Sequence, residues 1–519
     1  MGPSKKFFKR IFALALSAAL SGALLPGGQN LFAQERPRPQ VVQTSQGKIR
    51  GLFVGGVYRF LGVPYASAKE RFVPPVQAAP WNGVRDATKH GAICPQGTLF
   101  GAGRNVAGWG KSNDCLNLNI WTGAVNPDGG APGQKKRAVM VWLHGGGFSI
   151  GSANSAMFDG SNLARLYDVV VVGVNHRLNV FGHLDLSAFG KKYRHSANVG
   201  ILDIEAALRW VQQNIETFGG DPGNVTIFGE SGGGAKVLAL MAAPSAKGLF
   251  HKAINESGAA EKMGVEFTPQ ELSRELGRRT AELLGLDENN IEEIQKIGLL
   301  KIMAAGDKAR AALANERKIS FVDGEGYCLD WQPVVDGDFL PSSPVTQNAF
   351  AASAADVPLI VGSNLNEWSA WRECFSHPNM TQEQIDEYAL AYPEKDKESA
   401  PLVDTFFRLA LLKVAASKSG QKGANVYMYV FAKGVPKYGA FHTAEIPFVF
   451  ANCGDPLSAV MSQAWTNFAK TGVPFADGLP EWEPYSRQGG ATMIFDDQCR
   501  LARRHDERLM KMLVPGCSW

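Results

Sequence analysis

The chain has 519 residues, of which 45% are hydrophobic and 20% are charged, and this composition is typical of a globular protein with a large core. Its formal net charge of +4 is small for this length and its basic residues are scattered, which argues against a nucleic-acid partner. Length alone favours roughly two to four domains, but α/β enzymes often exceed that length as one domain with insertions.

The N-terminal segment has the pattern of an export signal. Basic residues open the chain, and an apolar, alanine-rich run at 11–25 follows, which is short for a membrane span. Small residues come next, so cleavage is expected after Ala33, with 21–23 as a second candidate and an uncleaved anchor as the alternative. Residues 1–33 are therefore predicted to be a signal peptide. No later stretch reaches transmembrane length, so we expect no stable membrane association of the mature protein. We expect residues 34–519 to form one domain that is exported and is periplasmic or secreted.

Strand and helix patterns alternate along the chain. Residues 40–59 are typical of antiparallel strands, and continuous apolar runs predict buried strands at 138–143 and 168–174. Apolar residues at alternating spacings of three and four then predict one face of a helix. That face carries Ile201, Ile204, Leu208, Val211 and Ile215. This order predicts an α/β fold with a mostly parallel central sheet and helices on both faces.

Residues 268–314 have a different character, with charged and leucine-rich helical patterns. Thr268-Pro269-Gln270-Glu271 predicts a capping box with proline at the first helical position. A helical insertion of this kind fits either a lid over the mouth of the α/β core or plain scaffold. Strand patterns return at 357–361 and 426–431.

A glycine-flanked serine ends the strand pattern at 225–228. Gly229-x-Ser231-x-Gly233 fits the nucleophile elbow, a tight strand-to-helix turn that lifts a serine hydroxyl clear of a sheet. Side chains at the flanking positions would clash in so close a turn. The first N–H groups of the following helix, with its positive dipole end, face an anion that forms beside the serine. We therefore expect Ser231 to be a nucleophile.

A glycine run after the strand at 138–143 complements the elbow. His144-Gly145-Gly146-Gly147 matches an oxyanion-hole motif, in which successive glycines let backbone N–H groups face a substrate without intervening side chains. Gly146, Gly147 and Gly232 are the expected donors. Losing one such donor costs about 3 kcal/mol of barrier in typical cases.

A serine nucleophile needs a base and a group that orients the base. Of nine histidines, His442 fits best, because it lies in a loop after a strand near the C-terminus, as the order serine, acid, histidine requires. Glu367 directly follows a strand and is the favoured acid. Asp336 is the alternative, although Asp336-Gly337 is first of all typical of a turn.

These residues together resemble the type B carboxylesterase family, the cholinesterase-like branch of the α/β-hydrolase fold. The resemblance extends from about Val41 to the C-terminus and rests on several separate motifs. They lie at 59–66, 113–119, 144–148, 218–222, 229–233, 364–367, 442–447 and 465–472. The family implies Ser231 as nucleophile, Glu367 as acid and His442 as base, and a first disulfide between Cys94 and Cys115. It also implies that Phe100 and Trp109, in the loop between these cysteines, line the entrance to the site, and 321–331 is a further candidate wall.

Two positions depart from the family pattern. Relatives usually have alanine where this chain has Gly232, and a small serine where it has Lys236. Lys236 is therefore a candidate for substrate binding that biases the site toward anionic esters, or for a buried ion pair with Glu230. The alternative is a lysine on the helix surface.

The remaining cysteines suit an oxidising compartment without suggesting a metal site. Cys499 and Cys517 could close a C-terminal loop, and Cys328, Cys374 and Cys453 remain. No spacing indicates structural zinc, so we expect neither a metal nor another cofactor.

The sequence as a whole predicts an exported serine esterase that acts through an acyl-enzyme on a small ester, as a monomer or homodimer. A non-catalytic binding protein of the same fold and a lipase with an apolar lid are the alternatives. Substrate class stays open between simple short-chain esters, plant aryl esters and anionic polyesters of the mycotoxin type.

Overall fold

The computed structural model describes residues 36–97, 108–126, 135–320, 329–346, 349–371, 376–435 and 438–518. The predicted signal peptide and Phe100 lie outside these residues. Within them, no helix combines the length and the apolar character that crossing a bilayer requires.

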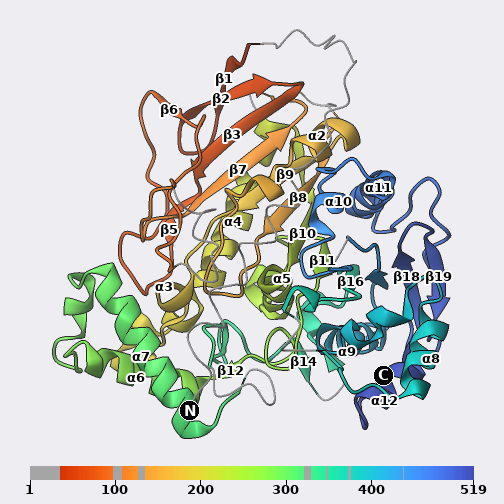
Figure 1. Ribbon diagram of the computed structural model, residues 1–519. Coiled ribbons are helices and arrows are strands. Elements are labelled where there is room, and N and C mark those ends of the chain that lie inside the picture. The colour runs from red at the N-terminus through yellow and green to blue at the C-terminus, as the bar shows by residue number, and fades with distance from the viewer. Residues whose placement is uncertain are drawn as a thin grey trace.

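In the described residues, thirteen strands form one sheet that crosses the molecule (Figure 1). Neighbouring strands from β9 to β18 are parallel, whereas the pairings toward both edges are antiparallel, except that β6 pairs parallel with β2. In order across the sheet the strands are β1 (Arg38–Gln43), β2 (Lys48–Val54), β3 (Val57–Pro64), β7 (Asn117–Thr122), β9 (Val170–Val174), β8 (Arg137–Leu143), β10 (Gly220–Glu230), β11 (Lys252–Glu256), β16 (Leu359–Asn364), β17 (Val426–Phe431), β18 (Ala491–Phe495) and β19 (Arg500–Arg503), with β6 (Val84–Asp86) beside β2. The predicted mostly parallel sheet is confirmed.

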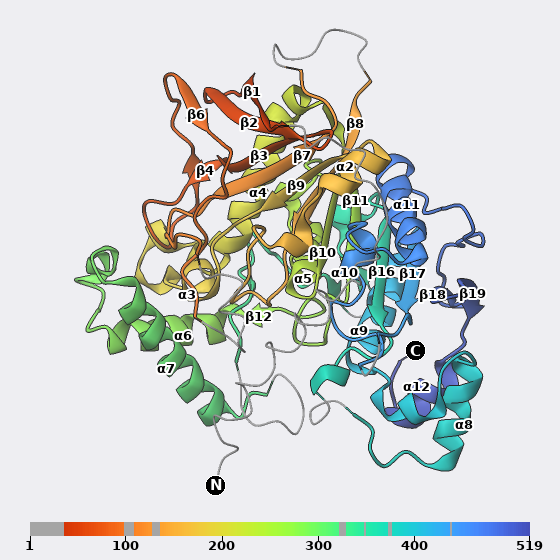
Figure 2. The same cartoon turned by 45° about the horizontal axis from the view of Figure 1, so that its top comes forward.

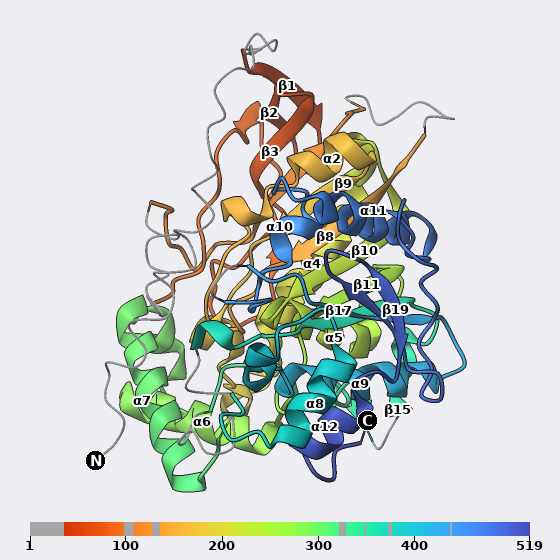
Figure 3. The same cartoon turned by 45° about the vertical axis from the view of Figure 1, so that its right-hand side comes forward.

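Helices cover both faces of this sheet. As a result, every residue of β9, β16, β17 and β18 is buried. One set, α4 and α5, contacts β10, and another set, α2 and α11, contacts β9 and β8. Figure 3 shows α2, α10 and α11 grouped together. The helices are α2 (Ser161–Tyr167), α3 (Asn179–His183), α4 (Val199–Asn214), α5 (Gly232–Ala242), α6 (Gln270–Leu283), α7 (Leu299–Arg317), α8 (Gln382–Ala391), α9 (Phe406–Ser419), α10 (Ile446–Val449), α11 (Pro456–Thr471) and α12 (Glu507–Leu513). Short strand pairs outside the sheet are β4 (Ala66–Ser67) with β5 (Val76–Gln77), β12 (Thr268–Pro269) with β13 (Val334–Val335), and β14 (Val345–Thr346) with β15 (Ala349–Phe350).

Helix α4 carries the predicted apolar face into the core. Four of the five periodic apolar residues lie in α4 and the fifth, Ile215, directly follows it, and all five are fully buried. A buried ion pair adds to this packing: Arg177, after β9, donates to both carboxylate oxygens of Asp203 on α4, at 2.8 and 2.6 Å. Neither side chain is exposed to solvent.

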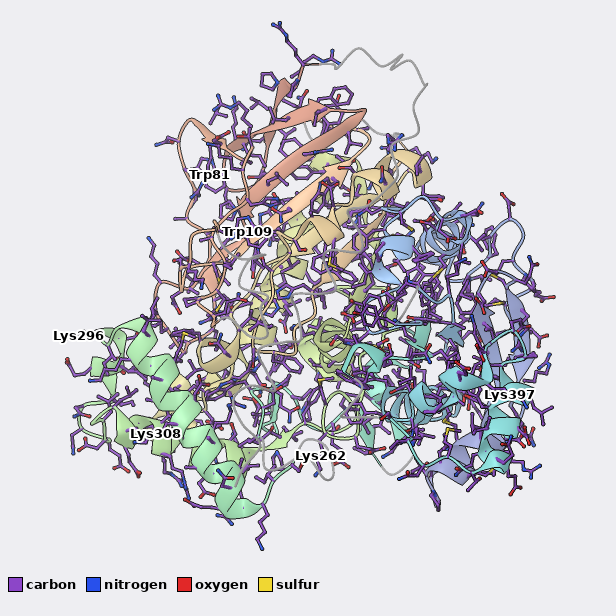
Figure 4. The ribbon with its side chains drawn as sticks, viewed as in Figure 1. Trp81, Trp109, Lys262, Lys296, Lys308 and Lys397 are labelled. Atoms are coloured by element: carbon purple, nitrogen blue, oxygen red, sulfur yellow. The ribbon has the colours of Figure 1, made fainter. Side chains whose placement is uncertain are left out.

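The predicted helical insertion contains α6 and α7, which pack on each other and lie to one side of the sheet (Figure 2). Figure 4 shows Lys296 and Lys308 on this side of the molecule. The predicted capping box is wrong, because α6 begins at Gln270 with Pro269 as its N-cap and no side-chain cap. Thr268 pairs with Val334 in the β12–β13 bridge instead, and this tertiary pairing overrides the local capping pattern.

Candidate active site

The turn between β10 and α5 holds Ser231 in a conformation that side chains rarely adopt. Its φ is 56° and its ψ is −128°, which costs of order 1–3 kcal/mol and persists only where the surroundings enforce it. A Cβ atom on Gly229 would lie 2.6 Å from the Gly233 carbonyl carbon, and one on Gly233 would lie 2.0 Å from the Leu143 oxygen. These contacts explain both glycines of the motif, and the turn places Ser231 at the positive end of α5.

The side chains of Glu367 and His442 meet beside the carboxyl ends of β16 and β17. His442 Nδ1 lies 2.6 Å from Glu367 Oε2, and both side chains are buried. The Asn364 N–H donates to Glu367 Oε1 at 2.7 Å, and the His442 N–H donates to the Glu367 carbonyl at 2.7 Å. Both the carboxylate and the backbone of the histidine are therefore fixed, as a base and its orienting acid require.

Two aromatic rings that the sequence did not indicate pack against the imidazole of His442. The ring centroids of Trp368 and of Phe407, from the first turn of α9, each lie 5.2 Å from that of His442 and 5.5 Å from each other. The Asp404 carboxylate accepts the N–H groups of Phe407 and Arg408, which anchors this first turn. This three-ring cluster restricts the orientation of the imidazole, and no local pattern in the sequence indicates it.

The alternative acid, Asp336, lies elsewhere. Its carboxylate accepts hydrogen bonds from the Asn198 side chain at 3.0 Å and from the Leu340 N–H at 2.9 Å. These contacts make Asp336 the organiser of a turn, in agreement with the Asp-Gly pattern. Of the two candidate acids, Glu367 is the one that reaches His442.

The Nε2 edge of the His442 imidazole faces Glu230, the residue before Ser231. Glu230 Oε1 lies 3.2 Å from His442 Nε2, and within the described part of the chain no hydrogen bond joins that nitrogen to the Ser231 hydroxyl. Catalytic hydrogen bonds are often long in unliganded proteins and shorten when substrate binds. Burial lowers the pKa of His442 to about 4 and raises the pKa of Glu230 well above its ordinary value. The imidazole is therefore neutral near pH 7, which is the state that accepts a proton.

The glycine loop after β8 lies against the start of α5. Gly146 and Gly147 have φ values of 89° and 61°, which glycine adopts without steric cost. A Cβ atom on Gly232 would lie 2.1 Å from the Gly147 carbonyl oxygen. The structure thus brings Gly146, Gly147 and Gly232, the three predicted oxyanion donors, together beside Ser231.

Lys236 is fully buried, so it is not a lysine on the helix surface. Its Nζ donates to the carbonyls of His144 and Gly147 at 3.0 and 2.8 Å and lies 5.2 Å from the ring centroid of Phe148. Among the described residues, no ion pair joins Lys236 to Glu230, so the predicted pair is not formed. Burial lowers the pKa of Lys236 to about 7.

The predicted walls of the entrance are described in part. Trp109 is half-buried, lies toward the N-terminal strands in Figure 4, and packs edge-on against His90 with centroids 6.2 Å apart. Of 321–331, the last three residues are described. Asp330 among them accepts a hydrogen bond from Ser149 of the glycine loop at 3.2 Å, so this segment reaches the site.

Cys94 and Cys115 are buried neighbours, but they are free thiols in the structure and not the predicted disulfide. The hydrogen bond with Cys94, which favours the protonated thiol, and burial together raise the pKa of Cys115. The Cys94 sulfur also accepts the Leu178 N–H at 3.2 Å, an interaction of a thiol that packs in the core. Cys499 and Cys517 are free thiols as well, whereas Cys328 and Cys374 lie outside the described residues.

Comparison with known proteins agrees with this geometry. The model of the carboxylesterase family matches residues 38–399 and 379–512. The para-nitrobenzyl esterase of Bacillus subtilis is 34% identical over 92% of this chain and 99% of its own length, and human cocaine esterase is 33% identical over 91% and 90%. A solved esterase from Clostridium hathewayi, described as able to hydrolyse aliphatic aromatic polyesters, superposes with a TM-score of 0.80 at 34% identity and covers 93% of this chain and 100% of its own. The chain belongs to the carboxylesterase family of carboxylic ester hydrolases.

Proposed function

We propose that this protein hydrolyses carboxylic esters through a covalent acyl-enzyme, with Ser231 as nucleophile, His442 as base and Glu367 as the acid that orients His442. The observation that carries the proposal is the 2.6 Å contact between His442 Nδ1 and Glu367 Oε2 beside a serine held at φ 56°. A neutral, oriented imidazole next to a serine in an elbow is what nucleophilic catalysis at neutral pH requires.

In the first half of the reaction, Ser231 Oγ attacks the ester carbonyl carbon while His442 Nε2 takes the hydroxyl proton. The carbonyl oxygen becomes an oxyanion, which the N–H groups of Gly146, Gly147 and Gly232 stabilise. The C–O bond to the alcohol then breaks, and the proton on Nε2 passes to the leaving alcohol. Before the attack, the His442 imidazole must exchange its approach to Glu230 for one to Ser231.

In the second half, a water molecule replaces the alcohol. His442 takes a proton from the water, its oxygen attacks the acyl carbon, and the bond to Ser231 Oγ breaks as the proton returns to that oxygen. The products are the carboxylic acid and the free enzyme. Throughout, Glu367 keeps Nδ1 protonated and stabilises the transient imidazolium.

Simple neutral esters are the proposed substrates, because Lys236 gives no support for anionic ones. Lys236 is the cation beside the glycine loop, but it is fully buried and both of its hydrogen bonds go to backbone carbonyls. It is therefore not exposed to pair with a carboxylate of the substrate. This arrangement supports a preference for uncharged acyl and alcohol groups.

The test is the hydrolysis of p-nitrophenyl esters of increasing acyl length by wild type and Ser231→Ala. We expect activity highest for short acyl chains and abolished in Ser231→Ala, with Asp336→Asn as a control that retains activity. A folded wild type that hydrolyses none of these esters would instead favour the non-catalytic binding protein. If Ser231→Ala hydrolysed these esters at the wild-type rate, the assignment of Ser231 as nucleophile would be refuted.

We also propose that the protein is exported and that Cys94 and Cys115 become linked in the oxidising compartment. Support comes from the export pattern of the N-terminal segment and from the adjacency of the two thiols. Protein recovered outside the cytoplasm should begin after Ala33. On reduction in denaturant it should gain two titratable thiols that Cys94→Ser lacks, and equal thiol counts before and after reduction would refute the bond.

A further inference from the structure

One face of α5 carries two residues that touch the glycine loop. Gly232 and Lys236 are four positions apart and so lie on the same side of the helix. The Gly147 carbonyl oxygen lies where a side chain on Gly232 would begin, 2.1 Å from an ideal Cβ position. The same oxygen accepts a hydrogen bond from Lys236 Nζ at 2.8 Å, and the His144 carbonyl accepts a second one at 3.0 Å.

The two contacts depend on each other. Without a side chain at Gly232, the Gly147 peptide can approach the helix axis closely, and Lys236 then holds its carbonyl in that position. A methyl group at 232 would compete with the carbonyl for the same space. The Gly147 peptide therefore keeps its position only when Gly232 leaves the space free and Lys236 holds the carbonyl.

Lys236 can hold the loop in either protonation state, because an amine has two N–H groups and an ammonium has three. The groups that face it electrostatically are Glu230 and Asp330, which raise its pKa, and the neutral rings of His144, His176 and His183. Burial lowers its pKa to about 7, so both states are populated near neutral pH. The two carbonyls keep their donors across this range.

We propose that Gly232 and Lys236 together form a dock on α5 that sets the position of the Gly147 peptide, and with it the geometry of the oxyanion hole. They act as positioning residues through the loop, although the Gly232 N–H is also an expected donor. The inference rests on the proposed function. It adds a reason why this chain combines glycine and lysine at these two positions.

The proposal is tested by combining Gly232→Ala with Lys236→Met, which keeps side-chain length but removes the donors. We expect each single variant to lower kcat about 10–100-fold with little change in KM, because a small misplacement of an oxyanion donor costs rate and not substrate affinity. The double variant should lose less than the product of the two factors, because without Lys236 the Gly147 carbonyl can move away from the new methyl group.

A trifluoromethyl ketone supplies a readout that general destabilisation does not move. It adds to Ser231 and places an oxyanion in the hole, so its inhibition constant should rise in parallel with the loss of kcat. Lys236→Gln keeps two N–H donors and should recover part of both losses. If Lys236→Met fails to fold, Lys236→Gln takes its place in the combination with Gly232→Ala.

Two matched controls separate docking from folding. Lys418 is also fully buried and donates to two backbone carbonyls, of Ala354 and Ala355, at 3.0 and 2.7 Å. Gly277 on α6 likewise has no room for a side chain, because its Cβ would lie 1.7 Å from the Asp185 oxygen. Lys418→Met and Gly277→Ala should lower the melting temperature but leave kcat and ketone inhibition unchanged.

Two outcomes would overturn the proposed dock and leave the proposed esterase activity intact. In one, the loss of kcat in the double variant equals the product of the two single losses. In the other, Lys236→Met has wild-type kcat and wild-type inhibition by the ketone. If wild type shows no Ser231-dependent hydrolysis, the proposed function fails, and amide hydrogen exchange of 144–151 decides the dock. Faster exchange there in Lys236→Met than in Lys418→Met supports it, and equal exchange overturns it.

Discussion

Changing Glu367 to glutamine keeps the shape of the proposed acid but replaces one carboxyl oxygen with an N–H donor. Glu367 Oε1 accepts the Asn364 N–H at 2.7 Å, and Oε2 faces His442 Nδ1 at 2.6 Å. A glutamine that keeps the first contact presents an N–H donor to Nδ1. The imidazole must then carry its proton on Nε2, which leaves no lone pair to accept the proton of Ser231.

The reverse orientation of the glutamine preserves the correct tautomer but opposes two donors, the amide and the Asn364 N–H. An unsatisfied buried donor costs about 1–3 kcal/mol, so this arrangement is a minority by roughly 5–150-fold. The stacked rings of Trp368 and Phe407, each 5.2 Å from the imidazole, oppose any turn of His442 that would escape the conflict. Together with the lost stabilisation of the imidazolium, kcat should fall by about 10⁴, or about 5 kcal/mol of barrier.

The assay is steady-state hydrolysis of p-nitrophenyl butyrate at pH 7.5 by wild type, Glu367→Gln and Asp336→Asn. KM should stay near the wild-type value, since Glu367 is buried behind His442. A Glu367→Gln variant that keeps more than about a tenth of wild-type kcat would refute the reasoning. The reasoning would also be refuted if Glu230→Gln lowered kcat by about 10⁴ while Glu367→Gln stayed active.

Three further predictions follow from buried charges. Asp203→Asn should lower the free energy of unfolding by about 3–5 kcal/mol in urea titrations, because it leaves Arg177 buried without its counter-charge; a loss below about 1 kcal/mol would contradict the burial of the pair. Since burial lowers the pKa of His442 to about 4, kcat/KM should stay flat from pH 7 to 5 and decline near pH 4, whereas a midpoint near 6.5 would contradict it. The pKa of Lys236 is about 7 in the folded state, against about 10.5 in the unfolded state, so the folded state binds fewer protons between these pH values. The free energy of unfolding of the wild type should therefore rise with pH in this range, by up to about 1.4 kcal/mol per pH unit. The Lys236→Met variant should lack this rise.

Local motifs made the fold and much of the candidate site predictable. The elbow around Ser231, the glycine run at 144–147 and the strand that precedes Glu367 each depend on a few adjacent residues whose steric needs are visible in sequence. Parallel strands bring their carboxyl ends to one edge of a sheet, so residues that follow separate strands meet there. This rule is enough to bring Glu367 to His442, and Asp336 forms a turn as its Asp-Gly pair indicates.

Features made by contacts between distant segments were not predictable in the same way. Trp368 and Phe407 belong to different elements and share no spacing with His442, so their cluster with the imidazole arises from tertiary packing. At Thr268, a pairing with Val334 overrode a plausible local cap. For Lys236 a signal existed, because a single lysine inside an apolar helix must be buried, but its carbonyl partners come from another segment.

The buried ionisable residues around the site form two groups, one on each side of the charge separation in the proposed transition state. Burial raises the pKa of Glu445 to about 7 and that of Asp404 to about 8, and both carboxyls raise the pKa of His442. Where they are ionised, these carboxyls favour the positive charge on the imidazole. Lys236, whose Nζ donates to the carbonyls of His144 and Gly147, in its protonated form favours the negative charge on the substrate oxygen in the proposed reaction. In that mechanism the separated charges of the transition state would be stabilised at both ends, which is how preorganised electrostatics lowers a barrier.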